Sequence, residues 1–307
     1  MLQASGERLV VSHEGNTLTT AGVHTLEAVV LHGAVQVTST ALARLLAAGI
    51  PCIYVALDGR LKGRLEPFGH PAAVLRGRQA LAAADPASRL QIAKQIVRSK
   101  LTSQTRLLRA LARPEASRLV SLLPRVRDAA TLDELRGLEG WAGRIYFAVF
   151  RDTLDLGDWR RTRRPVADPL NALISYGYAL LLRPAAAAIA TVGLDPYQGF
   201  LHQPGRARPA LVLDLIEEFR APLIDLTVLH TYRSLREGTG WYEATPAGPR
   251  LSLETRKSLI AQFESRLNRQ TMYRPTGRRE QVGRFFELQA RALARTIQSG
   301  TPYRPAW

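Results

Sequence analysis

The hydrophobic residues of this chain follow two different spacings. Up to about residue 69 they occur in short runs, either alternating with polar residues or continuous, and both patterns are typical of strands. The runs predict strands over 8–12, 26–31, 34–38 and 53–57. One helix is expected over 40–48, ended by Gly49, and Asp58-Gly59 is typical of a hairpin turn into 60–66.

Beyond residue 71 the hydrophobic residues recur every three or four positions, which is the period of an amphipathic helix. The pattern predicts helices over 73–84 and, after an Asp85 cap, over 86–112, with further helices to 298. A chain of 307 residues can support two separate cores. The sequence therefore predicts an α+β protein, with a small β-rich, β-sandwich-like domain over 1–70 and a larger all-α domain over 71–307.

One stretch of the helical region concentrates ionisable side chains. Gly199-Phe-Leu-His202 precedes a Pro/Gly/Arg loop, 203–209, which cannot continue a helix and can turn His202 toward the next one. On that helix four carboxylates are expected to share one face: Asp214, Glu217, Glu218 and Asp225. Such a group can bind a metal ion. The same pattern also suits a plain amphipathic helix and a surface or core histidine.

A second candidate carboxylate, Glu139, lies beside the core stripe of a predicted helix. The stripe consists of Leu135, Leu138, Ala142, Ile145 and Val149. Three glycines flank Glu139, at 137, 140 and 143, and each costs a helix up to about 1 kcal/mol relative to alanine. Close approach by another helix or by a ligand would explain them, and a frayed helix junction is the alternative.

The chain is strongly basic, with a net charge of +16, so polyanions are its expected partners. Nearly all the positive charge is arginine, which binds phosphate with two parallel hydrogen bonds, although a GC-rich genome would also favour arginine. Two clusters are candidate DNA-binding groups: Arg160, Arg161, Arg163 and Arg164 in a predicted loop, and Arg278, Arg279 and Arg284 toward the C-terminus. A solvated surface loop is the alternative for the first cluster.

Several blocks in a fixed order resemble the CRISPR adaptation integrase, the metal-dependent Cas endonuclease family that inserts new spacers into CRISPR arrays. The blocks cover 138–147, 163–178, 193–202, 214–220 and 289–294, and the resemblance extends over essentially the whole chain. It implies a metal-binding, catalytic triad of Glu139, His202 and Glu217, an accessory acidic Asp214, and Asn171 and Tyr176 lining the site. Trp141 stands where the family commonly has Asn, and we expect its indole to be buried.

The resemblance also implies the reaction. The free 3′-hydroxyl of a short incoming DNA would attack a phosphodiester at the end of a CRISPR repeat. Two carboxylates and one imidazole leave positions open on Mg²⁺ or Mn²⁺ for water and phosphate oxygens. The implied partners are double-stranded DNA, a second copy of the chain through the β-rich domain, and a dimer of a small ferredoxin-like Cas protein.

Two other functions fit parts of the pattern. A stand-alone, structure-specific DNA nuclease would use the same metal site, with water in place of the 3′-hydroxyl, and a non-enzymatic basic DNA-binding protein would need no metal. The longest apolar stretch, 178–194, is interrupted by Arg183-Pro184, and the N-terminus lacks a signal-peptide pattern. We therefore expect a cytoplasmic protein without a membrane segment. The single Cys52 is expected to be a small buried hydrophobe.

Overall fold

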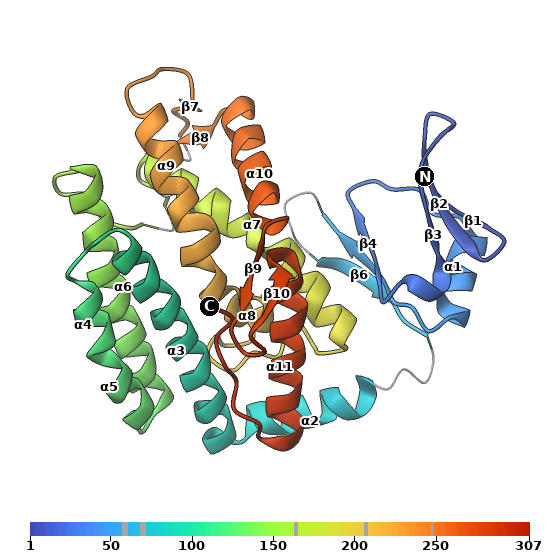
Figure 1. Cartoon of the computed structure of the whole chain (residues 1–307), viewed down its shortest axis with the longest axis horizontal. Helices are drawn as coiled ribbons and strands as arrows, with labels where there is room; N and C mark the ends of the chain where they lie inside the picture. The colour runs from blue at the N-terminus through green and yellow to red at the C-terminus, as the bar shows by residue number, and fades with distance from the viewer. Residues whose placement is uncertain (57–60, 68–71, 163–164, 206–207, 247) are drawn as a thin grey trace.

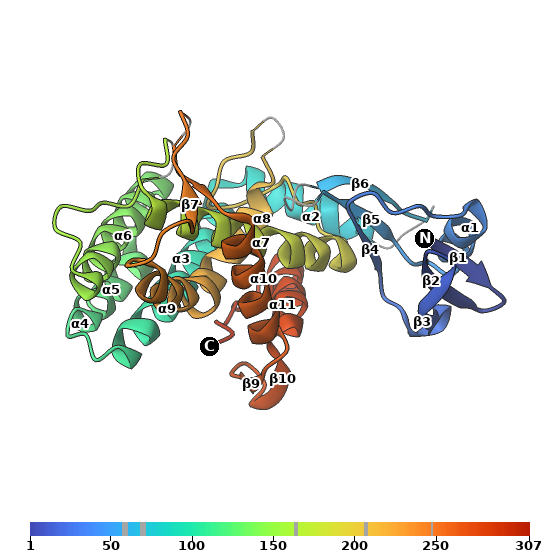
Figure 2. The ribbon, with the colours of Figure 1, turned by 90° about the horizontal axis from the view of Figure 1, so that it is seen from above.

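The computed structural model describes the whole chain except residues 57–60, 68–71, 163–164, 206–207 and 247. The strand-rich N-terminal part lies at one end of the molecule and the helices form the remainder (Figures 1 and 2). The predicted turn at Asp58-Gly59 and the change of pattern near 69–71 fall outside the described residues.

Two three-stranded sheets make up the N-terminal part. The first is antiparallel and contains β1 (Leu2–Ser5), β2 (Arg8–His13) and β3 (Asn16–Gly22), in that order, followed by the short helix η1 (Val23–Thr25). In the second, β4 (Val29–His32) pairs in parallel with β5 (Cys52–Val55), which pairs antiparallel with β6 (Leu61–Leu65). The parallel pair needs a crossover, and α1 (Ser39–Ala47) supplies it.

Several details of this part differ from the sequence pattern, including β1, which lies before the first expected strand. The residues of β3 are mostly exposed and polar, so the strand lacks the alternation that predicts strands, and we did not expect it. The strand expected over 34–38 is reduced to one bridge between Leu2 and Val37. The expected strand over 26–31 begins later, at Val29. Cys52 is buried as expected, in a small core that includes Leu9, Leu31 and Leu45.

The C-terminal part is helical, as predicted. Asp85 caps α3 by accepting a hydrogen bond from the backbone nitrogen of Ser88 at 2.8 Å. The helices are α2 (Ala72–Ala84), α3 (Pro86–Ala110), α4 (Ala116–Val120), α5 (Leu122–Asp128), α6 (Leu132–Leu154), α7 (Pro169–Val192), α8 (Ala210–Phe219), the π-helix η2 (Arg220–Asp225), α9 (Leu226–Leu235), α10 (Leu253–Leu267), the 3₁₀ turn η3 (Val282–Arg284) and α11 (Phe285–Ser299).

The helical part is not purely α. Two short hairpins interrupt it: β7 (Tyr242–Glu243) with β8 (Arg250–Leu251), and β9 (Gln270–Tyr273) with β10 (Arg278–Gln281). Because each hairpin pairs only two to four residues per strand, neither gives a clear period-two pattern in the sequence. The expectation of an all-α domain is corrected to that extent.

The core of the helical part is one large cluster that extends from Leu75 to Ala306. Helix α7 runs through it and, within the described residues, is the one helix long and apolar enough to cross a membrane. Half of its most apolar window is buried inside the protein, and it packs against α8, α9 and α11. We therefore describe α7 as a core helix.

Candidate metal-dependent active site

His202 is held by a tight turn against the start of α8. The backbone nitrogens of Phe200, Leu201 and His202 donate to the Asp214 carboxylate at 2.6, 3.1 and 2.9 Å. Gly199 permits this approach, since a Cβ there would lie 2.8 Å from the Ala210 carbonyl carbon. The carbonyl of Leu201 also accepts from Arg136 at 2.9 Å. The Gly-Phe-Leu-His sequence therefore fixes the histidine backbone before any ligand binds.

Asp214 also fixes the His202 ring. Its Oδ1 lies 2.7 Å from His202 Nδ1, and because an ionised carboxylate can only accept, Nδ1 carries the proton. The other nitrogen, Nε2, then presents a lone pair, and it lies 3.8 Å from Glu217 Oε1. A carboxylate behind a histidine is the usual partner of a metal-binding imidazole. Asp214 thus acts through His202, in keeping with an accessory role.

Glu217 is a buried carboxylate surrounded by positive charge. Its side chain is 3% exposed, and its oxygens lie 2.9 Å from Arg220 Nη2 and 2.8 Å from Lys100 Nζ. Burial alone would raise the pKa of Glu217, but the charges of Arg220 and Lys100 outweigh it and lower that pKa to about 2. Glu217 is therefore ionised over the whole physiological range.

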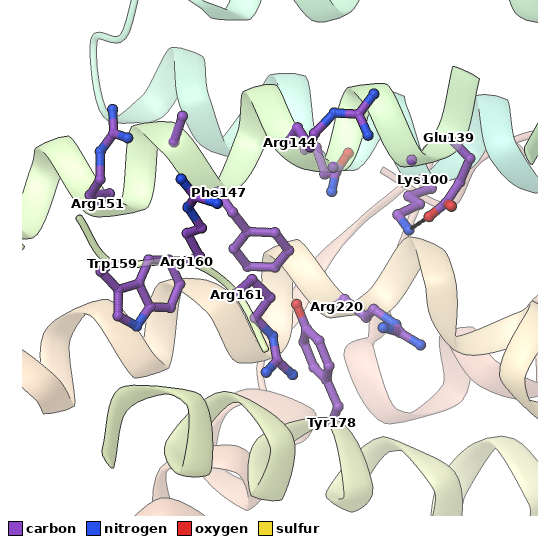
Figure 3. Close-up of a pocket in the computed structure, with 14 residues that line it drawn as sticks. Lys100, Glu139, Arg144, Phe147, Arg151, Trp159, Arg160, Arg161, Tyr178 and Arg220 are labelled. Carbon is purple, nitrogen blue, oxygen red and sulfur yellow. Dashed lines mark hydrogen bonds and ion pairs between the residues drawn. The ribbon is translucent and has the colours of Figure 1, made fainter. Parts of the chain in front are cut away.

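Glu139 joins this group through Lys100. The Lys100 ammonium forms an ion pair with Glu139 Oε1 (Figure 3) and another with Glu217 Oε2, so it links the carboxylates of α6 and α8. Glu139 is the most accessible of the three predicted ligands, at 26% side-chain exposure. Among the described residues, no three His, Cys, Asp or Glu side chains are arranged closely enough to hold a metal ion as they stand.

The donor chemistry nevertheless fits a divalent ion. Two carboxylates and an imidazole nitrogen with its tautomer fixed converge from three separate segments of the chain. Oxygen-rich sets of this kind suit Mg²⁺ or Mn²⁺. Glu139, His202 and Glu217 would hold the ion, and Lys100 would have to yield the carboxylate oxygens.

The other two carboxylates expected on this face point elsewhere. Glu218 accepts from Gln289 Nε2 at 2.6 Å and from Tyr303 Oη at 2.5 Å, which ties α8 to α11 and the C-terminal segment. Asp225 accepts from Tyr146 and Tyr178 at 2.8 and 2.7 Å. The expectation of a shared face is wrong because adjacent helical residues diverge and because the π-helix η2 changes the helical period before Asp225.

A basic cavity of about 500 Å³ lies beside Glu139, between α6 and α7 (Figure 3). We call it the arginine cavity. Its wall combines cations with aromatic rings and an amide, and it includes Lys100, Gln104, Arg144, Phe147, Arg151, Trp159, Arg160, Arg161, Tyr178 and Arg220. Cations bind phosphate and aromatic faces stack bases, so this composition suits a nucleic-acid strand.

A second cavity of about 430 Å³ borders the other side of the triad. We call it the histidine cavity, and it is lined by Arg136, Glu139, Leu201, His202, Gln203, Arg208 and Glu217. Glu139 lines both the arginine cavity and the histidine cavity. A substrate group can therefore approach the triad from either side.

The predicted DNA-binding arginines do not form one group. Arg160 and Arg161 line the arginine cavity, whereas Arg163 and Arg164 fall outside the described residues. The second cluster, Arg278, Arg279 and Arg284, lies on β10 and η3. In Figure 2 the β9–β10 hairpin projects from one edge of the molecule.

Asn171 and Tyr176 line neither cavity. Asn171 is fully buried, and its side chain accepts from Arg161 Nη1 at 2.8 Å and from the Thr162 backbone at 2.9 Å. It therefore holds the loop that carries Arg160 and Arg161. Tyr176 is half-buried near Arg256, and burial raises its pKa. Neither side chain makes a described contact with the triad.

Trp141 is not buried, contrary to expectation. Its side chain is 38% exposed, and the Arg125 guanidinium lies 5.1 Å from the ring centroid. Trp141 precedes the core residue Ala142 by one position, so about a quarter turn of the helix separates the two side chains and Trp141 lies outside the core stripe. Among the described residues, no atom of another element lies within 4 Å of a Cβ added at any of the three neighbouring glycines, so they do not serve helix packing.

The similarity of the chain to known proteins points to one family. The model of the family described as CRISPR associated protein Cas1 matches residues 1–265. The CRISPR-associated endonuclease Cas1 1 of Thermus thermophilus is 38% identical over 301 residues, which is 97% of this chain and 93% of that protein. The chain belongs to the Cas1 family.

Solved structures agree with the Cas1 fold. A casposase bound to integration product has a TM-score of 0.78 at 22% identity, over 98% of this chain and 94% of that one. A chain of a partial Cas6-RT-Cas1–Cas2 complex has a TM-score of 0.76 at 26% identity, over 100% of this chain and 95% of that one.

Within this Cas1 site, the sequence pattern did not identify Lys100 or Gln104. Both lie in the middle of α3, where a single lysine and glutamine carry no spacing signal. The one hint is composition, since lysine occurs only four times in a chain that uses arginine almost everywhere. A lysine on the buried face of a predicted helix is a candidate for a special role.

Proposed function

We propose that this Cas1 chain is a CRISPR adaptation integrase. It joins the 3′-hydroxyl of a short incoming DNA to a phosphodiester of the CRISPR repeat, exchanging one phosphodiester for another without ATP. The observation that carries the proposal is the convergence of Glu139, His202 and Glu217 between two cavities, with Asp214 behind the histidine.

The chain's own residues prepare the site. Asp214 holds the imidazole in one tautomer, and Arg220 keeps Glu217 ionised. A bound Mg²⁺ or Mn²⁺ would activate the attacking hydroxyl and stabilise the charge that develops on the phosphate. Arg136 and Arg208 in the histidine cavity would hold the phosphate oxygens of the target.

Two cavities that share Glu139 suit a reaction between two DNA segments. The arginine cavity offers cations and aromatic faces to an incoming strand, and the histidine cavity offers room for the target phosphodiester. A nuclease that uses water would need space for one DNA only. This arrangement favours strand transfer over hydrolysis as the principal activity.

Assembly and location belong to the same proposal. The strand-rich region up to residue 70 would join two copies of the chain, residues 71–307 would carry catalysis, and a dimer of a small ferredoxin-like Cas protein would complete the complex. The basic charge and the buried α7 suit a DNA-bound protein of the cytoplasm.

An integration assay with labelled DNA ends tests the function. Purified protein is mixed with the small Cas partner, Mn²⁺ and a plasmid that carries a repeat. Integration predicts label joined to the plasmid. Cleaved but unjoined DNA would identify the stand-alone nuclease, and binding without any cleavage or joining would identify a non-enzymatic DNA-binding protein.

A further inference from the structure

Lys100 occupies an unusual position for a lysine. It lies in the middle of α3, is 5% exposed, and is one of only four lysines in a chain with a net charge of +16. Lysine is seldom buried unless it is paired. A lysine ammonium is a compact charge on a flexible stem, whereas a guanidinium is a planar group that is harder to reorient. The choice of lysine here suits a charge that changes partners.

The partners of Lys100 are two of the three residues proposed to bind metal. Its ammonium pairs with Glu139 from α6 (Figure 3) and lies 2.8 Å from Glu217 Oε2 on α8. A divalent ion held by these two residues needs the same carboxylate oxygens. The ammonium and the ion therefore compete for the same carboxylate oxygens and cannot bind them at the same time.

Gln104 provides an alternative partner for Lys100. It lies four residues further along α3, so the two side chains share a face of the helix. Gln104 is 5% exposed, and within the described part of the chain its Oε1 is buried without a hydrogen-bond donor. Both residues line the arginine cavity. A buried acceptor without a donor is uncommon in folded proteins, and an ammonium turned by one helical turn would satisfy it.

We propose that Lys100 is a displaceable counter-ion of the metal site. Its ammonium holds Glu139 and Glu217 together until a divalent ion takes their oxygens, and it then turns to Gln104 Oε1 in the arginine cavity. Lys100 is a positioning residue in this scheme, because it acts through the two carboxylates. The inference rests on the proposed metal-binding role of Glu139, His202 and Glu217.

Mn²⁺ binding to the full-length protein, measured by electron paramagnetic resonance without DNA, tests the competition. Lys100→Met removes the competitor, so we expect Mn²⁺ to bind at least tenfold more tightly than to the wild type. Without metal this variant should melt at a lower temperature, and Mn²⁺ should raise its Tm more than it raises that of the wild type. Lys94→Met is the matched control, because Lys94 is also on α3 but its charge acts on Asp128.

Two outcomes separate this inference from the proposed function. If Glu217→Gln binds Mn²⁺ as the wild type does, the metal site itself is wrongly assigned. If Glu217→Gln loses Mn²⁺ while both Lys100→Met and Lys100→Gln bind it within twofold of the wild type, the metal site stands and the counter-ion role of Lys100 is overturned. The second lysine variant keeps the test decisive should Lys100→Met fail to fold.

A double-mutant cycle tests the destination of the ammonium. Gln104→Leu removes the acceptor, so in the wild-type background it should weaken Mn²⁺ binding about fivefold or more. In the Lys100→Met background there is no ammonium to receive, and the same change should leave Mn²⁺ affinity unaltered. Equal effects in the two backgrounds would overturn the transfer to Gln104.

Discussion

Each of the three proposed ligands has a different balance of charge and exposure. Glu217 is buried and pairs with two cations, Arg220 and Lys100, while Glu139 is partly exposed and pairs with Lys100. His202 is held by Asp214 at Nδ1, and its Nε2 lies 3.8 Å from Glu217 Oε1. Substitutions with the same effect on catalysis should therefore differ in their effect on folding.

We expect Glu139→Ala, His202→Ala and Glu217→Ala each to reduce Mn²⁺-dependent strand transfer at least about a hundredfold, because each removes a ligand. Only Glu217→Ala should also lower the free energy of unfolding substantially, by about 3–5 kcal/mol, since it leaves buried cations without their partner. Integration assays and urea unfolding on the same preparations measure both effects. Wild-type strand transfer by Glu217→Ala would show that the triad is wrong.

The contacts of Asp214 predict that it orients His202 for metal binding. From the sequence alone we expect its loss to be milder than that of a ligand, but the structure gives it four hydrogen-bonded contacts, three of them backbone N–H groups. Asp214→Asn has one acceptor oxygen fewer, so it should weaken metal affinity by about 10- to 100-fold and cost about 1–3 kcal/mol of stability. Mn²⁺ titration and thermal melting check this, and unchanged Mn²⁺ affinity would remove the orienting role.

The limits of sequence reasoning at this scale are physical. Glu139, His202 and Glu217 could be proposed because they stand inside recognisable blocks, and their convergence agrees with the proposal without testing it. The role of Lys100 could not be proposed from the sequence. It depends on the position of α3 between α6 and α8, and no local sequence pattern encodes that position. Trp141 was misjudged because its packing depends on a guanidinium from another helix, Arg125.

Among the elements, the junction of α8 with the π-helix η2 has the clearest effect on the site. It directs Glu217 toward His202 and Asp225 toward Tyr146 and Tyr178. Arg220, the first residue of η2, then lies with its guanidinium 4.5 Å from the Tyr178 ring while it contacts Glu217. The π turn thus connects the tyrosine pair to Glu217, a proposed metal ligand, and π turns are frequent at functional sites.

Asp225 gives this element a pH dependence. Burial raises the pKa of Asp225 to about 6 from 3.8, against the effect of its two tyrosine partners. Between about pH 4 and pH 6 the folded protein keeps a proton that the unfolded chain has lost, so stability falls as pH rises, by about 3 kcal/mol in total. Asp225→Asn should lose this decline.

Urea unfolding of wild type and Asp225→Asn at several pH values between 4 and 7 measures that difference. Asp152→Asn is a suitable control, since Asp152 is an exposed residue paired with Arg151. Other groups titrate in the same range, so the informative quantity is the gap between wild type and variant. A gap that does not change with pH would mean that Asp225 is ionised at pH 4 in the folded state.

Helices were predicted where capping residues and the hydrophobic spacing within the segment determine them. Helices α1, α2 and α3 begin and end within two residues of the expected positions, because capping and hydrophobic period agree there. Strand β3 was not predicted because its side chains are polar and exposed. Its pairing with β2 comes from the hairpin rather than from its own sequence pattern. The exposed β9–β10 hairpin was not predicted for the same reason.

At the scale of the whole molecule, two cores meet at a small contact. Ile53 and Val55 of β5 pack against Ala190 of α7, and Arg76 bridges Glu66 at 2.5 Å and the Gly193 carbonyl at 3.0 Å. The separate core of the strand-rich region is small, with eight buried hydrophobic residues among those that the structure describes. A region of that size gains stability when it buries a further surface.

We therefore expect the full-length protein to be a dimer joined through the strand-rich region, since a closed two-fold pair is the commonest way to bury such a surface. Light scattering at micromolar concentration should give about twice the mass of the chain, and addition of the small Cas partner should give a larger complex. A monomer under both conditions would contradict the assembly.

The final prediction concerns the path of DNA over the whole surface. Arg144 and Arg160 are exposed residues of the arginine cavity, so replacing both with Ala should weaken DNA binding for all sequences. The slope of log affinity against log salt should become shallower by about 1.4–1.8, because about 0.7–0.9 counterions are released per phosphate contact. Arg278→Ala with Arg279→Ala removes the same charge from the β9–β10 hairpin and should leave the slope nearly unchanged. The triad variants should also keep a near-normal slope while failing to join DNA, since binding without the ligands does not stabilise the transition state. A shallower slope for the hairpin pair, with no change for the cavity pair, would show that DNA lies across the hairpin instead.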